Sequence, residues 1–174
     1  VKKYLDEFLM DKHVIDLPYL LRYLLIKGII LNVRPKQSAE AYSLIWTDKS
    51  PLIDISEKVQ DKLSRISEIP VELAMRYGSP SMESTIEKMV LEHSDLRDLI
   101  ICPLYPHYAM ASTKSVIEHA NQIIRDRFPR LTLQYVGPFY NHPDYISVLS
   151  KIIEKNLGDS DYLLFSYHGI PVRH

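Results

Sequence analysis

The sequence predicts an α/β fold with an open parallel sheet and helices on both faces. From residue 70 onward, short apolar segments alternate regularly with longer amphipathic segments. Such alternation implies right-handed crossovers between parallel strands. The last short segment, residues 162–166, begins with a continuous apolar run, which is typical of a strand covered on both faces. These observations indicate a doubly wound lobe of the Rossmann or flavodoxin kind.

The composition indicates one globular domain. The chain has 174 residues, of which 46% are hydrophobic and 25% are charged, enough for a sizeable core. The formal net charge of −1 provides no basic footprint for nucleic acid. The single cysteine, Cys102, excludes an intrachain disulfide and a cluster of thiolate ligands. We therefore expect a reducing, cytoplasmic setting, and the first residues do not have the pattern of a signal peptide.

The first helix is predicted over residues 1–11. Tyr4, Leu5, Phe8 and Leu9 recur there at helical spacing, and charged residues occupy the other side. This pattern is typical of a surface helix that packs on a core.

Residues 18–31 are almost continuously apolar, interrupted only by Arg22 and Lys27 among charged residues. The segment is shorter than the ~20 apolar residues that span a bilayer. One interpretation is a buried core helix that ends at Gly28, and the sequence alone favours it. The other is an apolar lip that touches a membrane surface or a large flat ligand. Basic side chains close by, Arg34 among them, would suit anionic headgroups or carboxylates.

Two more helices are predicted before residue 70. Residues 34–38 form a loop, and Ser38 caps a helix over residues 39–46. Ser50 and the proline that follows it open another helix, which carries an apolar stripe.

The remainder of the chain supplies the sheet. Its apolar segments are rich in strand-forming residues, and the longer segments between them have helical periodicity. Strands are predicted at residues 71–77, 98–103, 131–136 and 162–166, and helices at residues 81–93, 112–128 and 143–157.

Aromatic side chains and histidines follow the predicted strands. Because parallel strands end at the same rim, the loops that carry Tyr105, Tyr108, Tyr140 and His168 are expected to meet. A single tyrosine at such a rim often only seals the end of the sheet. Several such loops together favour a site for a broad, flat, apolar ligand with a few polar groups.

His168 is the strongest candidate for chemistry. It lies on a turn with Gly169 and Pro171, directly after the last apolar segment. Imidazole is a common metal ligand and a proton acceptor near neutral pH. A lone histidine is more often structural, and no carboxylate lies within a few residues of this one. The chain has no phosphate-binding loop, zinc-protease motif or nucleophile elbow.

These residues resemble the ferrochelatase family, whose members insert ferrous iron into a porphyrin. The most specific match is the histidine motif Ser-Tyr-His-Gly-Ile-Pro at residues 166–171. Similar motifs are Leu-Tyr-Pro-His-Tyr at 104–108, Arg-Tyr-Gly-Ser-Pro at 76–80 and Ser-Ala-Glu-Ala-Tyr at 38–42. The resemblance runs from end to end, so it implies that residues 1–174 form an amino-terminal lobe of the type II chelatase kind.

The resemblance implies roles for six residues. His168 matches the family's active-site histidine, which is assigned either to binding the incoming iron or to taking a pyrrole proton. The positions that contact the porphyrin are matched by Arg34, Tyr42 and Ser50, and the aromatic rim of the pocket is matched by Tyr105 and Tyr108.

The resemblance also implies cofactors and partners. Residues 14–36 match the lip through which some members meet the membrane, which places the lip interpretation above the core interpretation. Met110 stands where some members carry a cysteine of an iron–sulfur cluster, so no cluster is expected. No tightly bound cofactor is implied, and ferrous iron and a porphyrin are the substrates. The expected location is the cytoplasm, with peripheral membrane contact.

The family pattern includes two parts that this sequence lacks. One is a strand with a Gly-Thr-Pro-like loop ahead of the first helix, and the other is a second lobe after the histidine motif. The second lobe supplies the acidic partner of the histidine, so this chain is expected to hold half of the metal site and to be inactive alone.

The expected function is therefore ferrous iron insertion into protoporphyrin IX to give heme. A histidine and a carboxylate that face a distorted ring would provide a proton acceptor and metal ligands. A domain that binds or carries a tetrapyrrole without metallating it is the alternative from another class. A doubly wound module of other function would bind no porphyrin.

Overall fold

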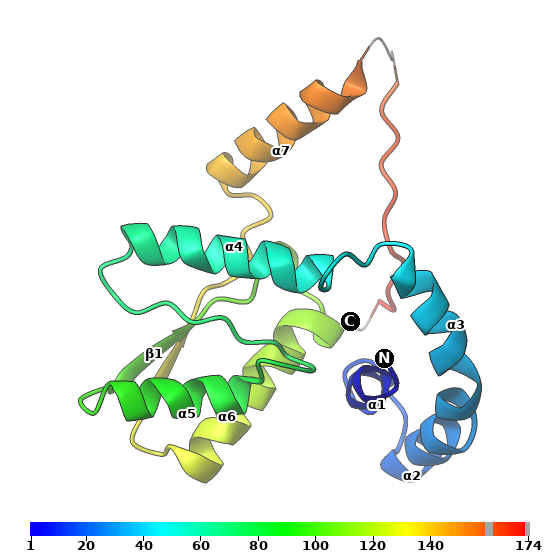
Figure 1. Cartoon of the computed structure of the whole chain (residues 1–174), viewed down its shortest axis with the longest axis horizontal. Helices are drawn as coiled ribbons and strands as arrows, with labels where there is room; N and C mark the ends of the chain where they lie inside the picture. The colour runs from blue at the N-terminus through cyan, green and yellow to red at the C-terminus, as the bar shows by residue number, and fades with distance from the viewer. Residues whose placement is uncertain (159–161, 173–174) are drawn as a thin grey trace.

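The computed structural model describes residues 1–158 and 162–172. Most of this chain is helical, and two short strands form the sheet (Figure 1). The elements in order are α1 (Lys2–Leu9), α2 (Tyr19–Tyr23), the π-helix η1 (Leu24–Ile30), α3 (Leu31–Ser43), α4 (Pro51–Ile66), α5 (Met82–Glu92), β1 (Asp98–Ile101), the π-helix η2 (Met110–Lys114), α6 (Ser115–Arg127), β2 (Thr132–Tyr135) and α7 (Pro143–Leu157).

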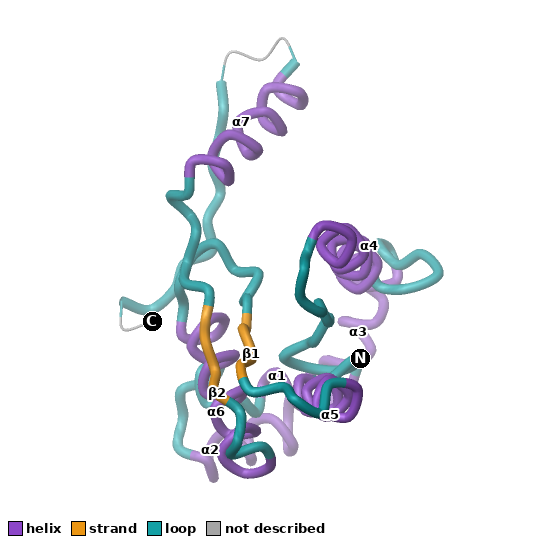
Figure 2. Tube along the Cα trace, turned by 90° about the vertical axis from the view of Figure 1, so that its left-hand side faces the viewer, coloured by secondary structure: helices purple, strands orange, loops and turns teal. Residues whose placement is uncertain are grey.

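Strands β1 and β2 pair in parallel, as the alternating pattern predicts (Figure 2). Leu99 lies beside Leu133 in the register, and both side chains face the helices α5 and α6. The opposite face of the sheet carries Ile100 and Gln134, which are exposed. The open parallel sheet of an α/β lobe is therefore confirmed. In the described residues, α5 and α6 both pack on one face of this sheet.

The main core lies between this covered face and the two helices. Helix α5 begins as predicted after Ser81, whose Oγ accepts a hydrogen bond from the Ser84 amide at 3.1 Å. Helices α5 and α6 then present one apolar stripe each to the sheet. The buried residues of this core are Met82, Ile86, Met89, Leu99, Val116, Ala120, Ile123, Ile124 and Leu131.

Residues 71–77 do not form the predicted strand. Their only ladder contact in the described chain is an isolated bridge from Met75 to Ser81. In a flavodoxin-like order the first strand of the chain lies beside the second. No strand precedes α1 among the described residues, so the backbone of residues 71–77 has no neighbour with which to pair.

Residues 162–166 are extended but unpaired, so the predicted fourth strand is also wrong for this structure. Leu164 is 93% exposed, and the neighbouring apolar side chains are exposed as well. Helix α7 begins at Pro143 as predicted but buries no residue and projects away from the sheet (Figures 1 and 2). A crossover helix returns the chain to a parallel sheet by packing on it. Because α7 does not pack, the following segment is not brought beside β2.

The amino-terminal helices form a second, smaller core. Leu5 and Leu9 of α1 pack with Ile26 and Leu31. Residues 19–43 run as one continuous helical segment, which corrects three expectations: a stop at Gly28, a loop over residues 34–38 and a cap at Ser38. Pro35 lies inside α3, where it removes one helical hydrogen bond. Burial of Ile26 and Leu31 against α1 offsets that loss.

Helix α4 begins at Pro51 after Ser50, as predicted. It buries none of its residues, although its apolar stripe is clear in the sequence. No helix in the described part of the chain is long and apolar enough to cross a membrane.

Candidate active site

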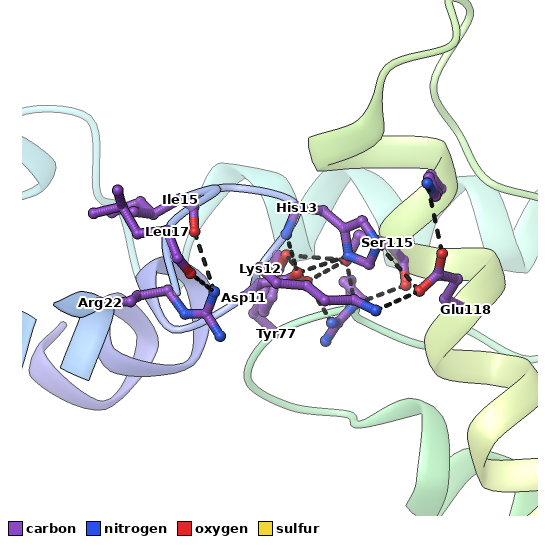
Figure 3. Close-up of polar contacts among 11 residues, drawn as sticks. Asp11, Lys12, His13, Ile15, Leu17, Arg22, Tyr77, Ser115 and Glu118 are labelled. Atoms are coloured by element: carbon purple, nitrogen blue, oxygen red, sulfur yellow. Dashed lines mark hydrogen bonds and ion pairs between the residues drawn. The ribbon is translucent and has the colours of Figure 1, made fainter. Parts of the chain in front are cut away.

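A buried carboxylate joins three distant segments of the chain (Figure 3). Asp11, which is 8% exposed, follows α1, and its Oδ2 accepts hydrogen bonds from Arg76 Nη2 at 2.5 Å and Tyr77 Oη at 2.8 Å. The Ser115 hydroxyl, at the start of α6, also donates to this oxygen. The His13 amide donates to Oδ1 at 2.8 Å. We call these five residues the Asp11 cluster.

The Asp11 cluster is closely packed with polar contacts. Arg76 donates to Asp11 through Nη2, and its Nε donates to Ser115 Oγ at 2.8 Å. His13 Nε2 lies 3.1 Å from Glu118 on α6, whose carboxylate also meets Lys12 at 3.0 Å near the surface. The negative charge of Asp11 is therefore balanced by the positive charge of Arg76, which reduces the cost of burying either group.

The pKa of Asp11 reflects this environment. Burial on its own would raise the pKa, but hydrogen bonds from Ser115, the His13 amide and Tyr77, with the charge of Arg76, lower it to about 2. Burial raises the pKa of Tyr77 far above its ordinary value. The hydrogen bond with Ser115 lowers this pKa in part, and the hydrogen bond to Asp11 raises it further. Asp11 is therefore ionised and Tyr77 is neutral at any physiological pH.

Tyr77 also belongs to a group of three packed rings. Its ring meets Phe8 edge-on, with centroids 5.3 Å apart, and Tyr4 edge-on at 6.4 Å. Tyr4 and Phe8, one turn apart on α1, stack in parallel at 5.9 Å. The Arg76 guanidinium lies 4.5 Å from the Tyr77 centroid. We call Tyr4, Phe8 and Tyr77 the aromatic wall.

Two of the predicted porphyrin-contacting residues lie near the aromatic wall. Burial raises the pKa of Tyr4, and Tyr42 and Tyr105 lie close enough to raise it further. Burial likewise raises the pKa of Tyr105, which the nearby charge of Arg76 opposes. Tyr4, Tyr42 and Tyr105 are each 36–38% exposed, so all three present part of their surface to solvent. Tyr42 and Tyr105, from two of the predicted motifs, therefore lie within electrostatic reach of Tyr4 in the aromatic wall.

The loops after β1 and β2 also meet, as expected for one rim. The Pro106 carbonyl accepts hydrogen bonds from the amides of Phe139 and Tyr140, both at 3.0 Å. The His107 and Tyr140 rings stack with centroids 5.3 Å apart.

Four predicted residues are not seen to join this face. Arg34 and Tyr108 are exposed, Ser50 is the amino-terminal cap of α4, and His168 is exposed on the extended segment after α7. No group of three potential ligands that could hold a metal occurs among the described residues. The roles predicted for these four residues, and those predicted for Tyr42 and Tyr105, stay predictions. A cleft of about 360 Å³ between α4 and α5, lined by Glu57 and Lys88 among others, contains no predicted site residue.

Residues 18–31 expose most of their apolar side chains. Ile26 and Leu31 are buried against α1, but Tyr19, Leu20 and Leu24 are each more than half exposed. The interpretation as a buried core helix is therefore wrong, because the segment packs along one narrow side only. Buried Arg22 fixes its start: Nη1 donates to the carbonyls of Leu17 at 2.9 Å and Ile15 at 3.3 Å.

Asp11 was not among the residues that the sequence predicted for the site. The Arg-Tyr pair at residues 76–77 was noted only as part of a motif. Asp11 and Arg76 are 65 residues apart, and nothing local in the sequence marks a carboxylate after a helix as buried. A charged residue directly after the apolar stripe of α1 was the available signal.

The parallel strand pair covered by α5 and α6 defines an α/β protein. A family model described as Ferrochelatase matches residues 1–174, and the chain belongs to the ferrochelatase family. Over 177 aligned residues, the chain is 44% identical to the ferrochelatase of Ectopseudomonas mendocina (strain ymp) and 43% identical to that of Pseudomonas fluorescens biotype C. The alignments cover all of this chain and 51% of each relative, so the chain spans about half the length of these curated relatives.

Proposed function

We propose that the intact protein inserts ferrous iron into protoporphyrin IX to form heme, and that this chain is the amino-terminal lobe. The observation that carries the proposal is the aromatic wall, in which the stacked rings of Tyr4 and Phe8 lie edge-on to Tyr77. A flat macrocycle needs a flat apolar contact surface, and aromatic rings supply it with few rotatable bonds. Membership of the ferrochelatase family supports the same conclusion.

Iron insertion exchanges two pyrrole protons for one ferrous ion. The barrier comes from removing the protons and from stripping water from the cation, and a ring held out of plane exposes its nitrogen lone pairs. We assign His168 to the metal side, as a ligand of the incoming ion or as the acceptor of a pyrrole proton. The reaction changes no oxidation state, so no tightly bound redox cofactor or iron–sulfur cluster is needed.

The remaining assignments concern the porphyrin. Tyr42, Tyr105 and Tyr108 are proposed to contact the macrocycle or its edge. Arg34 carries a guanidinium that can bind a propionate in a bidentate way, and Ser50 can donate a hydroxyl to the second propionate. An acidic partner for His168 is proposed to come from the part of the protein beyond this chain.

The test is a metal insertion assay on the intact protein with porphyrin and ferrous iron under anaerobic conditions. Loss of free-base porphyrin fluorescence reports insertion, and a titration without metal reports binding. We expect saturable binding and insertion far above the uncatalysed rate. Binding without faster insertion would instead indicate the carrier function, and the absence of both would indicate an unrelated doubly wound module.

Residues 14–36 are proposed to form an apolar lip with peripheral membrane contact at the cytoplasmic side. The exposed face of α2 and η1, with Leu20 and Leu24 one turn apart, supports this proposal. Burial of such side chains in the headgroup region, together with attraction of nearby basic residues to anionic lipid, drives interfacial binding.

Replacing Leu20 and Leu24 together by serine is expected to weaken binding to anionic vesicles about tenfold or more. Both side chains are more than half exposed, so the free energy of unfolding should change by less than about 1 kcal/mol. Sedimentation with vesicles measures the effect, and Leu91→Ser, at a still more exposed leucine on α5, is the control. Equal vesicle binding by the double variant and the unchanged protein would contradict the lip.

A further inference from the structure

The position of the aromatic wall depends on Asp11, which is not part of the wall but contacts one of its members, Tyr77. Tyr77 contacts both Tyr4 and Phe8 edge-on, so its ring fixes where the stacked pair on α1 can lie. The hydroxyl of Tyr77 donates to Asp11 at 2.8 Å. The guanidinium of Arg76, which covers the Tyr77 ring, is held by the same carboxylate. Two contacts that orient Tyr77 therefore end at Asp11, and its hydroxyl also lies 3.2 Å from Ser115 Oγ, which itself donates to Asp11.

We propose that Asp11 is a positioning residue that holds the aromatic wall in the geometry that receives the porphyrin. Its carboxylate locks Arg76 and Tyr77 against α6, and Tyr77 in turn sets the rings of Tyr4 and Phe8. Tyr4 lies within electrostatic reach of Tyr42 and Tyr105, the two tyrosines proposed to contact the porphyrin. This inference rests on the proposed function, because the face matters only if a flat macrocycle binds there.

The chemistry of the cluster suits positioning rather than proton transfer. Asp11 accepts hydrogen bonds from four groups, one of which is the guanidinium of Arg76, and its Oδ1 lies 2.8 Å from His13 Nδ1, so all of its strong acceptor directions are used. An ion pair with a short hydrogen bond in a buried site restricts both partners more than a neutral contact does. No contact joins the Asp11 cluster to His168 among the described residues. The effect of losing Asp11 should therefore fall on porphyrin binding.

The test compares the intact protein with Asp11→Asn, which keeps the size of the side chain but removes its charge. We expect the KM for porphyrin to rise about tenfold or more, because a misplaced contact surface binds the ring less well. The kcat should change by less than about threefold, since His168 is not touched. Asp126→Asn, an exposed carboxylate on the same helix as Ser115, is the matched control and should leave both constants unchanged.

A merely structural role gives a different result. If Asp11 only stabilises the fold, the variant loses active protein, so kcat falls in proportion and KM stays constant, which overturns the proposal. If Asp11→Asn does not fold, Tyr77→Phe removes only the hydroxyl that bonds Asp11 and keeps the ring. We expect its KM to rise by about threefold or more, and an unchanged KM overturns the proposal. Failure of the unchanged protein to bind porphyrin would refute the proposed function instead.

Discussion

Replacing His168 by alanine in the intact protein is expected to lower the rate of iron insertion by about 10²–10⁴-fold. This is the usual contribution of a positioned acid–base group, and a lost metal ligand acts in the same direction. Binding of the porphyrin should change little, because the aromatic face that we propose for it comes from other segments, α1, α3 and the loop after β1. The effect should therefore appear in kcat rather than in the KM for porphyrin.

Anaerobic insertion kinetics, with a fluorescence titration of porphyrin on the same preparation, measure the two quantities separately. The matched control is His93→Ala, a histidine at the carboxyl-terminal end of α5 that has no proposed role. Near-normal insertion by His168→Ala would remove this residue from the metal site. A parallel loss of porphyrin binding would show that His168 supports the binding face rather than the chemistry.

Local patterns predicted the helices of this lobe better than its strands. The starts of α4 at Pro51, α5 after Ser81 and α7 at Pro143 agree with the cap and proline signals in the sequence. A helix makes its hydrogen bonds within one segment, so local sequence decides much of it. The proline at residue 35 predicted a loop, but it lies inside α3, because packing of α3 on α1 outweighs the local preference of proline.

Strands depend on partners that local sequence does not supply. Residues 98–101 and 132–135 form a ladder because they lie side by side and because α5 and α6 cover one face of the pair. Residues 71–77 and 162–166 have suitable composition but no neighbouring strand in the described chain. A run of apolar residues therefore predicts the capacity to form a strand, and the ladder itself requires a second segment.

The same distinction applies to the site. The resemblance assigned porphyrin contacts to Tyr42 and Tyr105 one residue at a time, and those roles stay predictions. The Asp11 cluster was not predicted, since its carboxylate, guanidinium and hydroxyl come from residues 11, 76 and 115 and become a unit only in the fold. Charge pairing over such distances leaves no periodic or compositional trace in the sequence.

Replacing Arg76 by alanine is expected to lower the free energy of unfolding by about 3–5 kcal/mol. The guanidinium is the only cationic side chain of the Asp11 cluster apart from the titratable His13, and its removal leaves an ionised carboxylate buried without its main counter-charge. Breaking a buried ion pair by deleting one partner has this magnitude. Urea-induced unfolding of the intact protein at neutral pH measures the change.

The control is Arg127→Ala, which removes more ion pairs but at the surface. Arg127 contacts Glu83 at 2.6 Å and Glu87 at 3.0 Å, yet its side chain is 39% exposed, against 17% for Arg76. Exposed pairs contribute about 0–1 kcal/mol because water and salt screen them. If burial rather than the number of contacts decides the energy, Arg76→Ala must be several times more destabilising. Equal effects of the two variants would contradict this account.

The destabilisation caused by Arg76→Ala should depend on pH if it acts through the carboxylate of Asp11. The pKa of Asp11 is lowered from its ordinary 3.8 to about 2, so its ionised form stabilises the fold by about 2 kcal/mol above pH 4, and this contribution disappears as the pH falls through 2. Loss of Arg76 should raise the pKa of Asp11. In the variant, the Asp11 carboxyl therefore becomes protonated at a higher pH than in the unchanged protein, and a protonated carboxyl needs no counter-charge. The stability difference between the two proteins should therefore shrink as the pH falls from 4 to 2. A difference that stays constant over this range would mean that Arg76 stabilises the fold through packing, not through the carboxylate of Asp11.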